Sequence, residues 1–156
     1  MENQVPSHIP INHDDYHAEF VGHTWDNRQF FLTNPFVPKL GNSPGREFLA
    51  LYIFDADGNL LEAKIEDLGT RQTNEFPPGN KLDIHSNARL MRKWLTGLGD
   101  SSFGDIRIKP FRLERFGVEF GLIPQAPEEE DDDWSVIIEP GDCMAFYPPW
   151  DGDYDT

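Results

Sequence analysis

The apolar run from Phe48 to Phe54 constrains the fold more than any other feature of this sequence. Apolar residues fill both alternating sets of positions, so a strand formed by this run needs cover on each face. The turn-forming residues Asp55–Asn59 follow it, and apolar positions 61, 63 and 65 then alternate with charged positions 62, 64 and 66. This order predicts a hairpin between a central strand and a strand buried on one face, with Gly58 or Asn59 at positive φ in the turn.

Short strands are predicted elsewhere in the chain, because Gly and Pro make up 26 of the 156 residues and separate the apolar runs. A second hairpin is expected, with strands at residues 16–23 and 29–32. Residues 99–104 are expected to form a loop that contains Ser101 and Ser102. The remaining strand patterns lie at residues 105–109, 111–116, 117–123, 134–139 and 143–147.

One helix is predicted from about Asp83 to Leu98. Its apolar residues recur at helical spacing on a single stripe, which consists of Ile84, Ala88, Met91, Leu95 and Leu98. Arg89, Arg92 and Lys93 fall away from that stripe and are expected to face water. The sequence therefore predicts an α+β fold, an antiparallel β-sheet of roughly 6–8 strands with one main helix, at about 83–98, packed on one face.

The length of 156 residues indicates a single domain, 1–156, with an extended lead-in at residues 1–15 that is pinned at one or two points. The lone cysteine, Cys143, excludes an internal disulfide and indicates a reducing compartment. The lead-in lacks the basic and apolar regions of a signal peptide, and no apolar run approaches the ~20 residues that span a bilayer. We expect a cytoplasmic protein that does not enter membranes.

Charge is distributed unevenly along the chain. The acidic C-terminal third, residues 116–156, has twelve Asp or Glu residues and no Lys or Arg, so it supplies −12 of the net charge of −15. Nucleic acid and anionic membranes both attract positive charge, so neither is an expected partner. The densest acidic segment is Glu128, Glu129, Glu130, Asp131, Asp132 and Asp133. We interpret it either as a solvated loop or as a negative surface that docks a basic protein.

The C-terminal residues Trp150 and Tyr154 form a second candidate site. Frayed chain ends are usually poor in large aromatic residues, because exposing them gains nothing. Two alternatives remain open. The two rings fold back and seal the sheet, or they contact a partner together with Asp151 and Asp153.

No catalytic motif is found in the sequence. Asp55, Asp57 and Gly58 differ from an EF-hand, which needs Gly at the sixth position of its loop and Glu at the twelfth. Cys143 lies in an apolar context that is typical of an inert packing residue. Glycine-rich phosphate loops and strained nucleophile turns are also missing. We therefore favour a protein that is not an enzyme and that uses no cofactor.

The histidines near the N-terminus support an alternative function. His13 and His17 have the spacing that lets two imidazoles share a metal on a helix, whereas a strand would place His17, Glu19 and His23 on one face. Ordinary surface or turn histidines explain the same residues. His13, His17 and His23 are therefore weak metal-site candidates, and the alternative function is an enzyme or a small-ligand- or metal-binding protein that uses this His/acid cluster.

Four segments together resemble one group of small bacterial proteins. They are residues 48–58, 103–106, 116–122 and 149–156, and the likeness runs from about Ile9 to the end of the chain. Members of this group are labelled formate-hydrogenlyase regulatory protein-like. The resemblance implies a cytoplasmic bacterial protein without a catalytic motif, and it transfers no site residues. The leading hypothesis is a non-enzymatic regulatory or immunity-type module that binds a basic protein through the acidic C-terminal third.

Overall fold

The computed structural model describes residues 5–70, 87–141 and 144–156. Twelve strands and one helix lie in these ranges, and every strand pairing is antiparallel. In chain order they are β1 (Ile9–Ile11), β2 (Val21–Thr24), β3 (Gln29–Thr33), β4 (Phe36–Val37), β5 (Arg46–Phe54), β6 (Leu60–Thr70), α1 (Asn87–Gly97), β7 (Ser101–Phe103), β8 (Ile106–Ile108), β9 (Phe111–Arg115), β10 (Val118–Gln125), β11 (Ser135–Glu139) and β12 (Ala145–Phe146).

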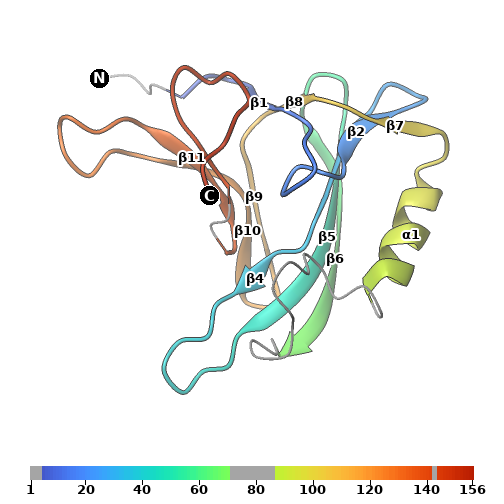
Figure 1. The fold of residues 1–156 in the computed structure, drawn as a ribbon, viewed down its shortest axis with the longest axis horizontal. Helices are drawn as coiled ribbons and strands as arrows, with labels where there is room; N and C mark the ends of the chain where they lie inside the picture. Colours follow the sequence, from blue (N-terminus) through green and yellow to red (C-terminus); the bar gives the residue numbers. More distant parts are fainter. Residues whose placement is uncertain (1–4, 71–86, 142–143) are drawn as a thin grey trace.

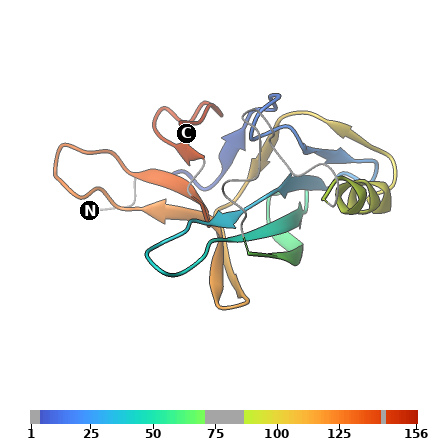
Figure 2. The same cartoon turned by 60° about the horizontal axis from the view of Figure 1, so that its bottom comes forward.

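The strands form three sheets (Figures 1 and 2). The largest has six strands in the order β4-β5-β3-β2-β7, with β6 paired to the other side of β5. A second sheet has the order β12-β11-β10-β9, and β1 pairs with β8 in a third. The predicted antiparallel α+β fold is confirmed, and its strands are divided among three sheets rather than joined in one.

Strand β5 contributes to two separate hydrophobic cores, as its sequence predicts. Phe48, Tyr52 and Phe54 point into the larger core, which also contains residues of β1, β8, β10 and β11. The intervening Leu49 and Leu51 point into a smaller core beneath α1. Because side chains alternate across a strand, an uninterrupted apolar run suits a strand that is covered on both faces.

Helix α1 covers one face of the six-stranded sheet. Met91 and Leu98 are buried in the smaller core, and Leu95 packs against it. The backbone N–H of Gly99 donates to Thr96 O at 3.1 Å, which closes the last turn. The predicted apolar stripe is confirmed for Met91, Leu95 and Leu98. Residues 83–86, including Ile84, lie outside the described ranges.

The N-terminal predictions need correction. Residues 15–20 form bends and turns rather than a strand, because the Asp14 carboxylate accepts hydrogen bonds from the backbone N–H of Tyr16 at 2.9 Å and of Ala18 at 3.0 Å. The predicted second hairpin therefore exists only as β2 and β3. The lead-in is also more tightly held than predicted, since Ile9 and Ile11 are fully buried and pair with β8.

Two other local predictions were wrong. Ser101 and Ser102 belong to strand β7 and not to a loop, because residues 101–103 pair with β2. Leu61 is 56% exposed instead of buried. The β5–β6 register shifts between Ile53 and Phe54, so that Phe54 pairs with Leu60 and the expected alternation begins only after this irregularity.

Candidate functional site

The acidic loop, residues Glu128–Asp133, joins β10 to β11 and lies at one end of the long axis of the molecule (Figure 1). All six side chains are exposed. The loop is turned by a backbone hydrogen bond from Asp132 N to Glu129 O at 3.1 Å. None of the six carboxylates pairs with a Lys or Arg of the described chain. The loop therefore presents six acidic side chains that no described cation neutralises.

Positive charge gathers at the opposite end of the molecule. Helix α1 lies at the other end of the long axis from the acidic loop in both ribbon views (Figures 1 and 2). Its residues Arg89, Arg92 and Lys93 are exposed, as predicted. Their positions, three and four residues apart, place them on one face of the helix. The molecule is consequently polarised, with an acidic loop at one end and a basic helix face at the other.

The C-terminal residues lie against the body of the protein. Trp150 and Tyr154 are partly buried and pack against the larger core, as the first of the two alternatives predicts. Asp151 and Asp153 are exposed beside them. A partner contact by these four residues remains a prediction.

Tyr154 fixes the C-terminal segment to the N-terminal turn. Its hydroxyl donates to Asp14 Oδ2 at 2.6 Å and accepts from the backbone N–H of His17 at 3.0 Å. Partial burial raises the pKa of Asp14, but the hydrogen bonds from Tyr154, Tyr16 and Ala18 outweigh it and hold that pKa below its ordinary value. Burial, followed by the bond to Asp14, raises the pKa of Tyr154. The segment is thus held by a charge-assisted hydrogen bond.

Asn12 makes the second connection between the two chain ends. Its backbone N–H donates to Gly152 O at 3.0 Å. Its side-chain amide donates to Asp151 O and to Asp153 Oδ1, both at 3.1 Å. These bonds connect the exposed Asp151 and Asp153 to the segment that follows β1.

The histidines do not assemble as either sequence hypothesis required. His13 Nε2 donates to Glu19 O at 3.1 Å, and its ring stacks on Phe103. His23 Nε2 donates to Asp105 O at 2.7 Å, while the ring of His17 lies against Tyr16. Residues 13–20 form neither a helix nor a strand, and only His23 lies in strand β2, so both proposed geometries were wrong. In the described ranges no group of three or more His, Cys, Asp or Glu residues could hold a metal. Cys143 lies outside the described residues.

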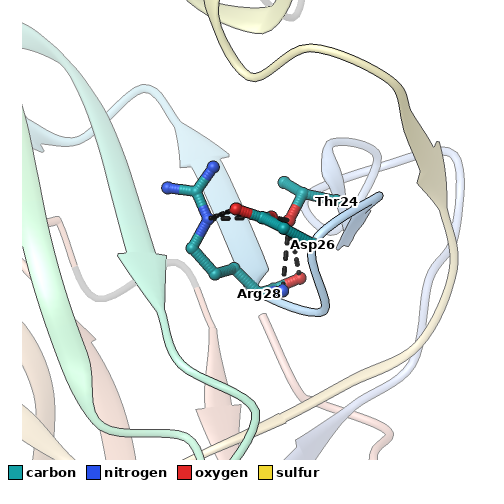
Figure 3. Close-up of polar contacts among 3 residues, drawn as sticks. All are labelled: Thr24, Asp26 and Arg28. Carbon is teal, nitrogen blue, oxygen red and sulfur yellow. Dashed lines mark hydrogen bonds and ion pairs between the residues drawn. The ribbon is translucent and has the colours of Figure 1, made fainter.

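The turn between β2 and β3, which the sequence predicts as part of the second hairpin, exposes a tryptophan that sequence reasoning did not single out. Figure 3 shows Asp26 between Thr24 and Arg28, where it accepts hydrogen bonds from the Thr24 hydroxyl and, at 3.0 Å, from Arg28 Nε. The bonds from Thr24 and then Arg28 hold the pKa of Asp26 below its ordinary value. Trp25 sits on this turn and is 73% exposed. The only sequence signal for this exposed side chain was a Trp within a predicted tight turn.

Comparison with known proteins supplies no relative. No protein-family model, curated protein or solved structure matches this chain. No helix in the described ranges is long and apolar enough to cross a membrane. The resemblance to formate-hydrogenlyase regulatory protein-like sequences thus remains a prediction from the four segments that carry it.

Proposed function

We propose that this protein is a non-enzymatic regulatory or immunity-type module of the cytoplasm that binds a basic protein partner. The observation that carries the proposal is the acidic loop, whose six exposed carboxylates have no cationic partner in the described chain and lie at the end of the molecule opposite the basic helix face. The resemblance to proteins with a regulatory label and the lack of a catalytic motif in the sequence support the same class.

The separation of charge between the acidic loop and the basic helix face gives the acidic loop a role in association. A basic protein is attracted toward the acidic loop and repelled from Arg89, Arg92 and Lys93, so it approaches in a restricted set of orientations. Such steering raises association rates by factors of roughly 10 to 1,000 at low ionic strength and is weakened by salt. Asp151 and Asp153 add two further exposed carboxylates on the C-terminal segment.

The loop can be tested with charge-matched variants. Replacing Glu128, Glu129 and Glu130 with Gln removes three charges from the acidic loop. The control replaces Glu62, Glu66 and Glu114 with Gln, which removes three exposed charges from β6 and β9. The partner is first captured with tagged protein from its native host, at low salt and at about 0.5 M salt, and identified by mass spectrometry.

We expect a basic partner that is recovered only at low salt. Its association rate should fall roughly tenfold with the loop variant and much less with the control, while both variants keep the thermal stability of the native protein. Equal slowing by both variants would show that only the net charge matters. A partner that binds equally well at both salt concentrations would contradict docking by charge.

The alternative function has no comparable support. His13 and His23 each donate a hydrogen bond to a backbone carbonyl, and no metal-ligating group forms in the described ranges. We therefore propose no catalytic, ligand-binding or metal-binding function for the histidines.

A further inference from the structure

The basic helix face, which consists of Arg89, Arg92 and Lys93, is directed away from the body of the protein. Met91 and Leu98 of the same helix are buried in the smaller core. Because an α-helix has 3.6 residues per turn, positions 89, 92 and 93 lie on the side opposite to these two. The three cations are exposed, and α1 lies at one end of the long axis (Figure 1). The basic helix face is therefore open to solvent at that end.

No described acid neutralises the basic helix face. None of its three cations forms an ion pair with an Asp or Glu of the described residues. The exposed Asp100 and Asp105 follow the end of α1 and do not interrupt this face. The sequence around it is positive as a whole, since residues 87–115 contain seven Lys or Arg and three Asp or Glu. The face is thus an unpartnered cationic surface.

A surface that complements this face is present on the chain itself. The acidic loop has six exposed carboxylates that no described cation neutralises, and it lies at the other end of the long axis (Figures 1 and 2). Because the two surfaces lie at opposite ends, the loop does not reach the helix of its own chain. The acidic loop of a second copy meets no such restriction.

The net charge of −15 opposes contact between two copies, but the position of the charges limits this repulsion. A contact between loop and helix keeps the two acidic loops one molecular length apart. The Debye length is about 10 Å at 0.1 M ionic strength and about 30 Å at 0.01 M. At about 0.1 M, distant charges are consequently screened from one another, whereas opposite charges in direct contact still attract.

We propose that copies of this protein associate head to tail, with the acidic loop of one copy docked on the basic helix face of the next. Charge complementarity identifies the occupant as a second copy, because the same chain carries both surfaces. The contact is heterologous, and each added copy leaves one loop and one helix face free. The product is therefore an open chain of copies and not a closed two-fold dimer.

Self-association also regulates the acidic loop. A loop that is docked on a neighbouring copy is not accessible to the basic partner, so head-to-tail contacts compete with partner binding. This consequence rests on the proposed function, whereas the contact between copies does not. The two are therefore tested separately.

Two charge-reversal variants test the contact by sedimentation velocity at about 0.1 M salt. The loop variant replaces all six residues of Glu128–Asp133 with Lys, which changes the net charge from −15 to −3. The helix variant replaces Arg89, Arg92 and Lys93 with Glu, which changes it to −21. Protein concentrations up to about 1 mM detect contacts with a Kd of that size.

We expect the native protein to associate reversibly and each variant alone to associate at least ~10-fold more weakly, because like charges then face each other. An equimolar mixture of the two variants should recover association, since the Lys loop of one meets the Glu helix of the other. Both variants keep a negative net charge, so overall attraction does not explain such recovery.

A matched control separates the basic helix face from the net charge. Replacing Lys39, Arg107 and Arg115 with Glu also changes the net charge to −21, at three exposed cations outside α1. We expect this control to associate like the native protein. Thermal unfolding of every variant shows whether the fold is kept.

Several results would overturn the inference. A native protein that stays monomeric up to about 1 mM would contradict the contact and leave the proposed function intact, since capture of a partner needs only the acidic loop. Equal weakening by the helix variant and the control would assign the effect to net charge. A closed dimer that survives both reversals would place the contact elsewhere. Self-association without capture of any basic partner would instead contradict the proposed function alone.

Discussion

Two tyrosine hydroxyls of this protein lie in contrasting environments. Tyr52 is fully buried in the larger core, its ring contacts Phe31 and Phe111, and its hydroxyl has no hydrogen-bond partner among the described residues. Burial raises the pKa of this phenol. Tyr154 instead bonds through its hydroxyl to both Asp14 and His17. The free energy of an unpaired buried hydroxyl is unfavourable, whereas a bond to a carboxylate is stabilising.

The two tyrosines allow a matched prediction. Tyr52→Phe keeps the ring and removes the desolvated hydroxyl, so it should leave the free energy of unfolding unchanged or raise it by about 1 kcal/mol. Tyr154→Phe should lower it by about 1 kcal/mol, because Asp14 and the His17 N–H lose a partner. Urea denaturation of both variants provides the measurement. A loss of stability in Tyr52→Phe as large as in Tyr154→Phe would contradict the unpaired state of the buried hydroxyl.

At the scale of elements, the C-terminal segment depends on close contact with the segment that follows β1. Gly152 is buried with φ of +97°, and a Cβ at this position would lie 2.3 Å from Asn12 Oδ1. Only glycine combines this left-handed backbone with so close an approach. The sequence Trp150–Tyr154 therefore packs against the core because a glycine inside it lets the backbone reach Asn12.

Gly152→Ala should detach this segment. Gly69 has nearly the same φ, +95°, but a Cβ there would meet no atom within 4 Å. Gly69→Ala thus measures backbone strain alone. Gly152→Ala should lower the free energy of unfolding by about 1–3 kcal/mol more than Gly69→Ala does, because it also displaces Asn12. Hydrogen exchange at residues 145–156 and thermal unfolding would measure the difference. Equal losses in the two variants would contradict a specific role for the contact with Asn12.

At the scale of the whole molecule, four aspartates couple the fold to pH. Asp14, Asp26, Asp55 and Asp67 all have pKa values below the ordinary value. For the last three the leading causes are hydrogen bonds, from the Thr24 hydroxyl, the Asn59 backbone and the Arg46 side chain respectively. For Asp14, partial burial raises the pKa and several hydrogen bonds more than offset it.

These shifts predict a loss of stability in acid. A carboxyl with a lower pKa in the folded state stabilises the fold above its unfolded pKa, about 3.8 to 3.9, and this contribution disappears as pH falls through the folded pKa. The urea midpoint should therefore fall progressively below about pH 4. The Asp67→Asn variant should be less stable than the native protein at pH 7. Its urea midpoint should fall less on acidification, since the bond between residue 67 and Arg46 no longer depends on ionisation. A midpoint that rises below pH 4 would contradict this linkage.

The sequence by itself determined the elements whose pattern is local and long. The run Phe48–Phe54 with its following turn, the stripe on α1 and the exposed acidic loop each contain enough consecutive residues to reveal their periodicity or charge. Gly58 takes positive φ in the turn, with a value of 89°. For the candidate site, the exposed position of Glu128–Asp133 could be predicted, because six adjacent carboxylates repel one another and cannot share a core.

Only the tertiary structure decided the short strands and the contacts between chain ends. Strands β1 and β7 have three residues each, too few for a two-residue period to be distinguished from a loop, and their pairing with β8 and β2 supplies the missing hydrogen bonds. The bond between Tyr154 and Asp14 joins residues 140 positions apart. Local sequence carries no information about which distant donor meets which acceptor, so the packed C-terminus, the scattered histidines and the edge position of β7 follow from the fold alone.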